Sequence, residues 1–427
     1  MRSEWKEVKL KYLIEKMGDG GTPSTLNQNN FGGDIPWVVV EDIRPEIYDT
    51  NTKLTDTGFS SCSAKLWPID SVILSTGATI GEVGIAKVPL CTKQGITGLV
   101  CNEFANNYYL KFWFEHNRNT LFRYSQGTTF KEIRPRPLGN LRIKIPSPLT
   151  KESVIEQKTI AGIISNVDEA IEAVESSIKA ADRLKKSLMQ NLLTGKLKPD
   201  GTWRGEDEFV VDEKFGKVPV GWTVKSLKDL ILFHQYGMNI SSSDSGTVPM
   251  FRMNNIIDGR IVDSPMVMVN ISDSDFEKYK VEKGDILFNR TNSLELVGKI
   301  GIFEMEGDYV FASYLIRIRA TEDNEPEYLN YYLNSYKGQT LLRAKATPAV
   351  SQANINAKSL VQTYVPRPPK ETQTEIVQLI KSHEDIKLGH SKKLQALKTL
   401  KKSLMQNLLT GKIRVDVEKI NTLLEEA

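Results

Sequence analysis

The sequence lacks the short motifs by which most enzymes are recognised. It has no Gly-x-x-x-x-Gly-Lys-Ser/Thr loop, no Gly-x-Gly-x-x-Gly opening a helix, no His-Glu-x-x-His, no Gly-x-Ser-x-Gly and no Asn-Pro-Pro-aromatic tetrapeptide. Such motifs hold phosphates, metals, nucleophiles or the amino group to be methylated. The absence of all of them from 427 residues favours a binding protein over an enzyme.

Cysteine and histidine are also scarce. The three cysteines, Cys62, Cys91 and Cys101, lie in the first half of the chain without a Cys-x-x-Cys pair, which is typical of a reducing compartment. His383 and His390 are seven residues apart in the sequence, or about 10 Å along a helix, which is too far for both to bind one metal ion. We therefore expect neither a metal site nor a disulfide framework.

Long apolar runs are missing as well. No stretch approaches the roughly 18 apolar residues of a membrane span, and residues 1–10 contain no apolar signal-peptide core. The net charge is only +3, so any nucleic-acid binding would depend on local basic patches rather than on the total charge. A cytoplasmic protein without a membrane partner is expected.

What the sequence does contain is an internal repeat. The thirteen residues 184–196 return unchanged as residues 400–412, an identity too long to arise by chance. Weaker matches at similar offsets flank them, such as Trp5 with Trp222 and Gln157 with Gln373. Most of the residues between these matches differ. The two copies therefore share a set of framework residues, and the segments between those residues differ.

Each copy ends in a long helical pattern. Apolar residues at alternating spacings of three and four form a heptad seam, which Lys185 interrupts in the first copy. Two such helices in one chain can cover each other's apolar stripes as an antiparallel pair. The predicted seam consists of Ile164, Val167, Ile171, Val174, Ile178, Leu188, Leu192, Ile380, Leu394, Leu397, Leu404 and Leu408.

The remaining segments combine short β-rich runs with one helical stretch in each copy, over residues 108–124 and 327–344. This predicts an α+β fold with an internal two-fold pseudo-repeat, in which two mixed α/β domains are separated by two long antiparallel coiled-coil helices. The expected boundaries are 1–149 and 222–369 for the two domains, 150–197 and 370–412 for the two helices, 198–221 for a linker and 413–427 for a C-terminal tail.

In kind and in order, these pieces resemble the specificity subunit of type I restriction-modification systems. The resemblance covers the whole chain. It is carried by Trp5, the Gly-Asp-Ile-Pro-Trp-Val of residues 33–38, the Lys-Gly-Asp-Ile-Leu-Phe of residues 283–288 and the Pro-rich entries into both helices, 145–148 and 365–369. It implies that each domain is a target recognition domain that reads one half of a bipartite, asymmetric DNA site, with the gap set by the paired helices.

The resemblance also implies the partners. The helices would dock two copies of the modification (methyltransferase) subunit, and the assembly would recruit a restriction subunit that translocates and cuts double-stranded DNA. The chain itself would bind no cofactor, because S-adenosylmethionine, ATP and Mg²⁺ would be bound by those partner subunits.

Polar loops that follow strands and helices in each domain are the candidates for DNA contact. Arg reads guanine, Asn and Gln read adenine, and hydroxyl groups contact bases or phosphates. The candidates in the first domain are Thr76, Gly77, Thr79, Gln126, Thr128, Thr129, Lys131 and Arg134. Those in the second are Arg252, Asn254, Asn255, Arg290, Thr291, Asn292, Ser293, Gln352 and Asn354.

Two other functions remain open at this point. A coiled-coil interaction scaffold could carry two ligand-binding domains and bind no DNA, and the Lys-rich stretches 179–198 and 392–402 favour solvated or partner-facing surfaces over a DNA track. A self-contained nuclease or methyltransferase would need the motifs that are missing. Steeply salt-dependent retention on DNA would separate the first of these from a DNA-binding protein.

Overall fold

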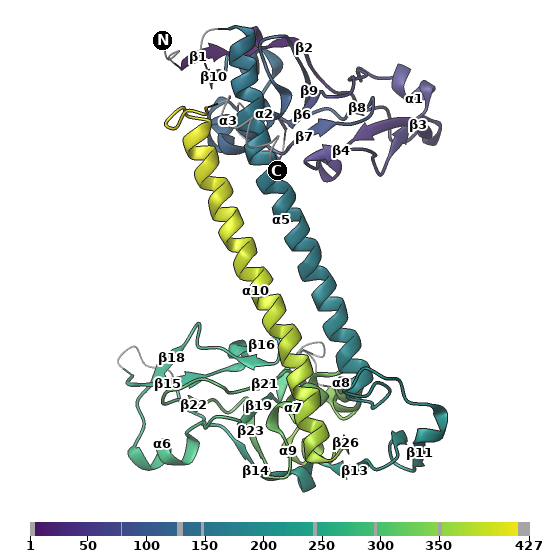
Figure 1. Ribbon diagram of the computed structural model, residues 1–427, viewed down its shortest axis with the longest axis vertical. Helices are drawn as coiled ribbons and strands as arrows, with labels where there is room; N and C mark the ends of the chain where they lie inside the picture. The colour runs from purple at the N-terminus through teal and green to yellow at the C-terminus, as the bar shows by residue number, and fades with distance from the viewer. Residues whose placement is uncertain are drawn as a thin grey trace. The chain divides into compact units, whose positions relative to one another are not determined.

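The computed structural model describes residues 5–77, 79–125, 131–146, 149–241, 246–293, 297–348 and 352–416, which form two compact units (Figure 1). Unit 1 comprises the chain up to Glu175 together with the residues from Lys392 onward, and unit 2 comprises Ser176–Ser391. Each long helix, α5 (Lys151–Leu192) and α10 (Lys370–Leu408), therefore contributes one part to each unit.

Unit 1 is organised on a five-stranded sheet with the order β2-β9-β6-β7-β4. Strands β1 and β10 pair with each other and join the start of the unit to its last strand, and a smaller sheet, β5-β3-β8, carries α1. The strands are β1 (Lys6–Lys9), β2 (Ile14–Asp19), β3 (Phe31–Val38), β4 (Glu46–Ile47), β5 (Lys53–Leu54), β6 (Val72–Ser75), β7 (Val83–Ala86), β8 (Cys91–Thr92), β9 (Ile96–Cys101) and β10 (Arg142–Ile145). The helices are α1 (Asp56–Ser60), α2 (Asn107–His116), α3 (Arg118–Tyr124) and α4 (Pro135–Gly139).

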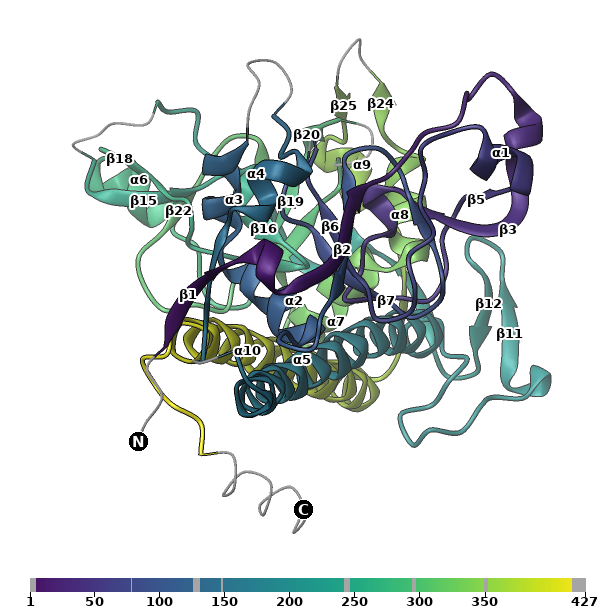
Figure 2. The same cartoon turned by 90° about the horizontal axis from the view of Figure 1, so that it is seen from above.

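Helix α2 lies between the sheet of unit 1 and the long helices (Figure 2). Its Tyr109, Phe112 and Phe114 share one apolar core with Ile160 and Ile164 of α5 and with Met405 and Leu408 of α10. The ends of both long helices are therefore part of this core rather than appendages to it.

Unit 2 repeats this plan with a six-stranded sheet of order β14-β23-β19-β21-β17-β16. Its strands are β11 (Phe209–Asp212), β12 (Gly216–Pro219), β13 (Thr223–Ser226), β14 (Ile231–Tyr236), β15 (Val248–Phe251), β16 (Ile256–Ile257), β17 (Arg260–Ile261), β18 (Val267–Val269), β19 (Ile286–Asn289), β20 (Thr291–Asn292), β21 (Ile300–Ile302), β22 (Val310–Phe311), β23 (Leu315–Ala320), β24 (Thr347–Pro348), β25 (Ala353–Asn354) and β26 (Tyr364–Arg367). Its helices before α10 are α6 (Asp273–Tyr279), α7 (Pro326–Asn334), α8 (Tyr336–Arg343) and α9 (Ala357–Val361).

The two single helices expected within the domains are each broken into two. Asn117 separates α2 from α3, and its side-chain amide donates to the Trp113 carbonyl at 2.9 Å. Ser335 separates α7 from α8, and its hydroxyl donates to the Tyr332 carbonyl at 2.6 Å. Short polar side chains compete for backbone groups in this way and end a helix, a local effect that the helical periodicity alone does not reveal.

The same contacts hold the frame of both units. Gln157 of α5 accepts a hydrogen bond from the Asn106 amide at 3.0 Å, and Gln373 of α10 accepts one from the Glu325 amide at the same distance. A buried tyrosine on α2 donates its hydroxyl hydrogen to a backbone carbonyl of β10. A buried tyrosine on α7 makes the same contact with a backbone carbonyl of β26. Matched residues in the sequence are thus matched in their contacts.

The long helices are antiparallel within each unit. In unit 1, Lys398 and Lys401 of α10 pair with Glu175 and Asp168 of α5 at 2.8 and 2.7 Å. In unit 2, α10 residues of lower number pair with α5 residues of higher number. The predicted seam residues are buried (Ile164, Ile171, Val174, Leu192, Ile380, Leu408) or half-buried (Val167, Ile178, Leu188, Leu394, Leu397, Leu404).

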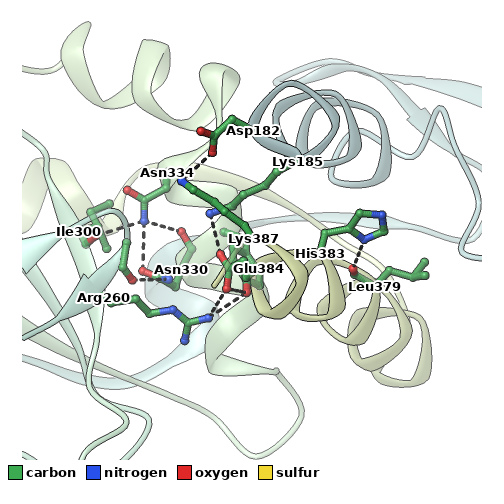
Figure 3. Close-up of polar contacts among 12 residues, drawn as sticks. Asp182, Lys185, Arg260, Ile300, Asn330, Asn334, Leu379, His383, Glu384 and Lys387 are labelled. Carbon is green, nitrogen blue, oxygen red and sulfur yellow. Dashed lines mark hydrogen bonds and ion pairs between the residues drawn. The ribbon is translucent and has the colours of Figure 1, made fainter. Parts of the chain in front are cut away.

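Lys185, which interrupts the apolar seam, pairs with Glu384 across the two helices at 2.6 Å (Figure 3). Glu384 also accepts hydrogen bonds from Arg260 of β17 at 2.6 Å and from the Tyr331 hydroxyl at 2.9 Å. Burial raises the pKa of Glu384, but the hydrogen bonds from Lys185 and Arg260 outweigh burial and leave that pKa below its ordinary value. At the repeat offset, Lys185 corresponds to Lys401 and Glu384 to Asp168. Lys401 and Asp168 form the matching ion pair in unit 1.

Two other expectations meet the structure at particular segments. The stretch 198–221 contains a β-hairpin, β11 with β12. His383 is half-buried on α10, with its Nδ1 2.8 Å from the Leu379 carbonyl oxygen one turn earlier (Figure 3). Within the described ranges, no helix is long and apolar enough to span a membrane, and no group of His, Cys, Asp and Glu side chains is arranged to hold a metal ion.

Candidate nucleic-acid interface

In unit 1, the loop after β6 is tied to the turn before β9. The Thr76 and Gly77 amides both donate to the Gly95 carbonyl at 2.8 Å. The Thr76 hydroxyl lies 3.0 Å from the Thr97 hydroxyl, and Thr76 is only 1% exposed. This burial argues against a direct DNA contact by the Thr76 side chain, whereas Thr79 at the same loop is exposed.

The loop before α4 contacts the loop after β6. The Ile133 amide donates to the Thr76 carbonyl at 2.8 Å, which brings the exposed Lys131 and Arg134 beside the loop after β6. The other candidates of this segment, Gln126, Thr128 and Thr129, lie outside the described residues.

Two further residues of unit 1 are at this location but were not predicted. Lys93 and Gln94 are exposed in the turn between β8 and β9, next to Gly95. The Asp19 carboxylate accepts from the Gly95 amide at 3.1 Å and so fixes the turn, and burial raises the pKa of Asp19. The equivalent turn of unit 2 contains Tyr314, since the Gly77 amide donates to Gly95 as the Arg290 amide donates to Tyr314. Neither turn was singled out from the sequence.

In unit 2, Arg290 is held rigidly at the end of β19. Its amide donates to the Tyr314 carbonyl at 3.0 Å, and its carbonyl accepts from the Ile355 amide at 2.9 Å. Its guanidinium carbon lies 4.9 Å from the centre of the Tyr236 ring. Among the described residues, the buried Nε of Arg290 has no hydrogen-bond partner. An unsatisfied buried donor of this kind is a candidate for contact with a ligand.

The neighbouring candidates form a small sheet of β20, β25 and β24. The Asn354 amide donates to the Thr291 hydroxyl at 2.7 Å, so these two side chains hold each other. Ser293 and Gln352 are exposed at the open ends of these strands. In Figure 2 this small sheet lies on the side of unit 2 away from α10.

A third loop reaches the same surface. The Asn292 amide approaches the Met253 sulfur at 3.7 Å, which brings the loop of Arg252 and Asn254 beside β20. Asn254 is exposed, whereas Asn255 is fully buried, where it accepts from the Arg252 amide at 2.9 Å. Asn255 thus closes the loop, and its burial argues against a role in base reading. Like Arg290, Arg252 has a buried Nε without a partner among the described residues.

The structure therefore brings together loops that are far apart in the sequence. In unit 2 these are the loops around residues 252–254, 290–293 and 352–354, and in unit 1 they are the loops at 76–79, 93–95 and 131–134. Each group offers exposed Arg, Lys, Asn, Gln or Thr side chains, which are the donors and acceptors that read base edges and phosphates. Chemically, both surfaces are suited to binding, and their described residues include no nucleophile paired with a base.

Comparison with known proteins places this arrangement in context. A family model described as "Type I restriction modification DNA specificity domain" matches residues 2–181 and 219–399. The specificity subunit of the type I restriction enzyme MjaIX from Methanocaldococcus jannaschii is 26% identical over 97% of this chain and 94% of that protein. The EcoKI specificity subunit from Escherichia coli K12 is 24% identical over 69% of this chain and 63% of that protein.

A solved structure shares the fold. The crystal structure of the type I restriction-modification S subunit from M. genitalium superposes with a TM-score of 0.57 at 15% identity, and the match covers 95% of this chain and 96% of that one.

Proposed function

Because this chain belongs to the family of type I restriction modification DNA specificity domains, we propose that it is a specificity subunit that reads a split, asymmetric DNA site. Each unit reads one half-site. In domain terms, residues 1–149 and 222–369 are the two target recognition domains, and 150–197 and 370–412 are the spacer helices that set the gap. The subunit selects the site and leaves the chemistry to its partners.

The observation that carries the proposal is the convergence of loops in unit 2. Two arginines of these loops, Arg252 and Arg290, each have a buried Nε with no hydrogen-bond partner among the described residues. The backbone of each is held by hydrogen bonds to neighbouring segments. Guanidinium groups beside Asn and Gln side chains suit bidentate contacts to base edges.

The two half-sites should differ, because the two reading surfaces differ. Unit 1 offers Thr79, Lys131 and Arg134, and unit 2 offers Arg252, Asn254 and Arg290 at the loops described above. A base pair is read by the pattern of donors and acceptors opposed to it. Different patterns in the two units therefore support an asymmetric site.

The repeated helix ends support docking of two copies of one partner. Packing explains why the buried positions of residues 184–196 and 400–412 are identical, but it does not explain the exposed ones. Leu184 and Leu400 are 47% and 46% exposed, and exposed lysine, serine and glutamine residues also recur at equal positions, namely Lys186, Ser187 and Gln190 with Lys402, Ser403 and Gln406. An identical surface presented twice fits a partner that binds twice, here the modification subunit.

The remaining parts of the assembly follow from this role. The modification subunits would bring S-adenosylmethionine, and a restriction subunit would bring ATP and Mg²⁺, so this chain needs no cofactor of its own. The complex would act on double-stranded DNA in the cytoplasm.

Methylome sequencing tests the proposal directly. The chain is co-expressed with its modification subunit in a host without DNA methylation, and modified sites are mapped. The expected result is one split motif of two unlike half-sites around a fixed gap. An assembled complex that methylates nothing, together with no salt-dependent retention on DNA, would instead favour the scaffold function.

The docking surface has its own test. Lys186→Glu and Lys402→Glu should each reduce the bound modification subunits from two to one, and the double variant should bind none, as counted by native mass spectrometry. Lys179→Glu, which is also exposed on α5 but lies outside the repeat, is the matched control and should still bind two. Equal behaviour of all variants would contradict docking at the repeated surface.

A further inference from the structure

A pocket of about 310 Å³ opens on the reading surface of unit 2. Its floor is formed by the buried Met238 and Met250, and the half-buried Met253 forms one wall. The half-buried Arg252 also lines it, and the exposed Asn254 and Tyr314 stand at its rim, with Tyr314 52% exposed. An apolar floor with a few polar groups at the rim is the usual composition of a binding pocket.

Matching hydrogen bonds identify the same place in unit 1. The Met238 amide donates to the Phe311 carbonyl at 2.8 Å, and the Gly21 amide donates to the Thr92 carbonyl at 2.9 Å. Met250 pairs with a β22 residue in a parallel ladder, as Trp37 pairs with a β8 residue. Gly21 and Trp37 of unit 1 therefore correspond to Met238 and Met250 of unit 2.

Unit 1 fills the space that unit 2 leaves open. The Trp37 indole is only 5% exposed, and its Nε1 donates to the Gly21 carbonyl at 3.0 Å. A large indole above a glycine occupies the volume that two flexible methionine side chains leave open. At the rim, unit 1 also has Val40 and Glu41 in the places of Met253 and Asn254, at the spacing of the sequence repeat.

The methionines and Asn254 of the pocket match one kind of base pair, whereas Arg252, which also lines the pocket, can contact a neighbouring phosphate or base. Asn can make paired hydrogen bonds to N6 and N7 of adenine, and the distinguishing group of thymine in the major groove is its apolar C5 methyl. Methionine is soft and adaptable and suits contact with a small apolar group. An Asn at the rim of a methionine-lined pocket therefore presents partners for both bases of an A·T pair.

We propose that this pocket reads an A·T pair in the half-site of unit 2, with the thymine methyl against Met253 and the adenine edge against Asn254. The inference rests on the proposed DNA-reading function and assigns the base pair that one part of the surface selects. Unit 1, in which Trp37 fills the pocket, has no such methyl contact.

Base analogues test the methyl contact in the full chain assembled with its modification subunits. Each thymine of the methylome-derived site is replaced in turn by deoxyuridine, which lacks only the methyl, and binding is measured. We expect a loss of about fourfold at one position of the unit 2 half-site, as for burial of a single methyl-sized group. No thymine of the unit 1 half-site should show this loss.

Variants then link that loss to the pocket. Met253→Ala should bring thymine and deoxyuridine to nearly equal affinity at that position, and Met253→Leu should retain most of the difference. Val40→Ala, at the corresponding place in unit 1, is the matched control and should leave the difference unchanged. A thymine preference that persists in Met253→Ala would overturn the assignment.

The adenine contact has a separate readout. Replacing the paired adenine by 7-deazaadenine removes the N7 acceptor, and we expect a loss of about five- to tenfold in the parent chain. In Asn254→Ala, adenine and 7-deazaadenine should bind with nearly equal affinity, because that variant has no side-chain amide to contact N7. An undiminished loss in Asn254→Ala would remove this residue from the proposal.

Failure of this inference can be told apart from failure of the proposed function. If the complex binds unmodified target DNA no better than unrelated DNA, the proposed function is wrong. If it binds the target specifically but no deoxyuridine in either half-site weakens binding, only the pocket assignment is wrong.

Discussion

The two units share their frame and differ at their reading surfaces. Gln157 and Gln373 make the same capping contact, and Lys401–Asp168 repeats Lys185–Glu384. In contrast, Trp37 over Gly21 in one unit corresponds to an open pocket in the other. Residues that hold the domain to its helices make the same contacts in both units, whereas residues of the two proposed reading surfaces differ. The comparison separates framework from specificity within one chain.

A second difference lies at the junction of domain and helices. In unit 2, Glu384 is held by Lys185, Arg260 and Tyr331. In unit 1, Asp168 pairs with Lys401, which also contacts Glu115 of α2. In unit 1, Glu115 and Asp168 each lie near two lysines, Lys401 and the buried Lys111. The pair that crosses between the helices is the same, but unit 2 has one central carboxylate whereas unit 1 has two carboxylates that share two lysines.

The largest expected effect comes from lengthening the frame without changing either reader. Seven residues that preserve the heptad pattern are inserted after Glu175 in α5 and after Ser391 in α10, where the two units meet in the sequence. If the helices set the gap, it should grow by about three base pairs, because seven helical residues span about 10 Å and DNA rises about 3.4 Å per pair. Methylome sequencing should then find the old half-sites at the new spacing and none at the old one.

Insertion into α5 alone is the control for this experiment. It removes the match between Lys185 and Glu384 and should reduce assembly rather than produce a new gap. An unchanged gap after the paired insertion would show that the helices do not act as the spacer.

The next largest effect concerns stability. Glu384→Ala leaves Lys185 and Arg260 close together without their shared anion, and removal of one member of a partly buried ion pair of this kind should lower the free energy of unfolding by about 2 to 3 kcal/mol. Asp168→Ala should cost less, because Lys401 keeps Glu115 as a partner. Urea unfolding of both variants measures the difference. Asp385→Ala, an exposed neighbour on α10, should have almost no effect, and equal losses for Glu384 and Asp168 would contradict the asymmetry.

A single substitution should weaken DNA recognition by one unit and leave recognition by the other unit unchanged. Arg290→Ala should weaken binding or relax the sequence preference in the unit 2 half-site only, by about 1 to 3 kcal/mol if the guanidinium contacts a base. Lys131→Ala in unit 1 is expected to act on phosphate instead, with equal weakening at all sequences and a salt slope smaller by about one. Competition binding with single-base variants of both half-sites distinguishes these results. Uniform loss in Arg290→Ala would make that residue a phosphate contact.

The smallest expected effect is a pH dependence confined to the unit 2 network. The pKa of Glu384 is held below its ordinary value of 4.5, so its contribution to stability is present above that value and is lost as the pH falls through the lower, folded pKa. The stability difference between the parent chain and Glu384→Gln should therefore shrink as the medium is acidified below about pH 4.5. Unfolding measured from pH 7 to pH 3 checks this. A difference that grows on acidification would contradict the direction of the shift.

The family, with its DNA specificity domain, and the α+β fold with its two-fold repeat were predicted from the sequence, and the comparisons confirm them. They were predictable because the framework residues recur. The break in the seam at Lys185 also follows the repeat. The same offset relates Lys185 to Lys401 and Asp168 to Glu384, so each copy has a lysine and an acidic residue at matching positions.

The details of the reading surfaces were less accessible. Thr76 and Asn255 are polar residues in suitable loops, but their side chains turn inward to Thr97 and to the Arg252 amide. A sequence shows which loop a residue occupies and not the direction of its side chain. The pocket of unit 2 could not be predicted for a related reason. Its volume depends on which residue packs against Met238, and that contact joins strands that are separated in the sequence.

The ends of the long helices determine when each half of the molecule can be completed during synthesis. Trp222 packs near Gly195, a short distance along the chain, whereas Trp5 packs against Gly411 and the core of unit 1 includes Met405 and Leu408. The first domain to leave the ribosome thus waits for the last helix, roughly 10 to 50 s later at ordinary rates of translation. A chain cut short by a nonsense mutation or by early termination would leave this core unfilled and exposed to chaperones and proteases. The cell would in this way eliminate incomplete readers before they reach DNA.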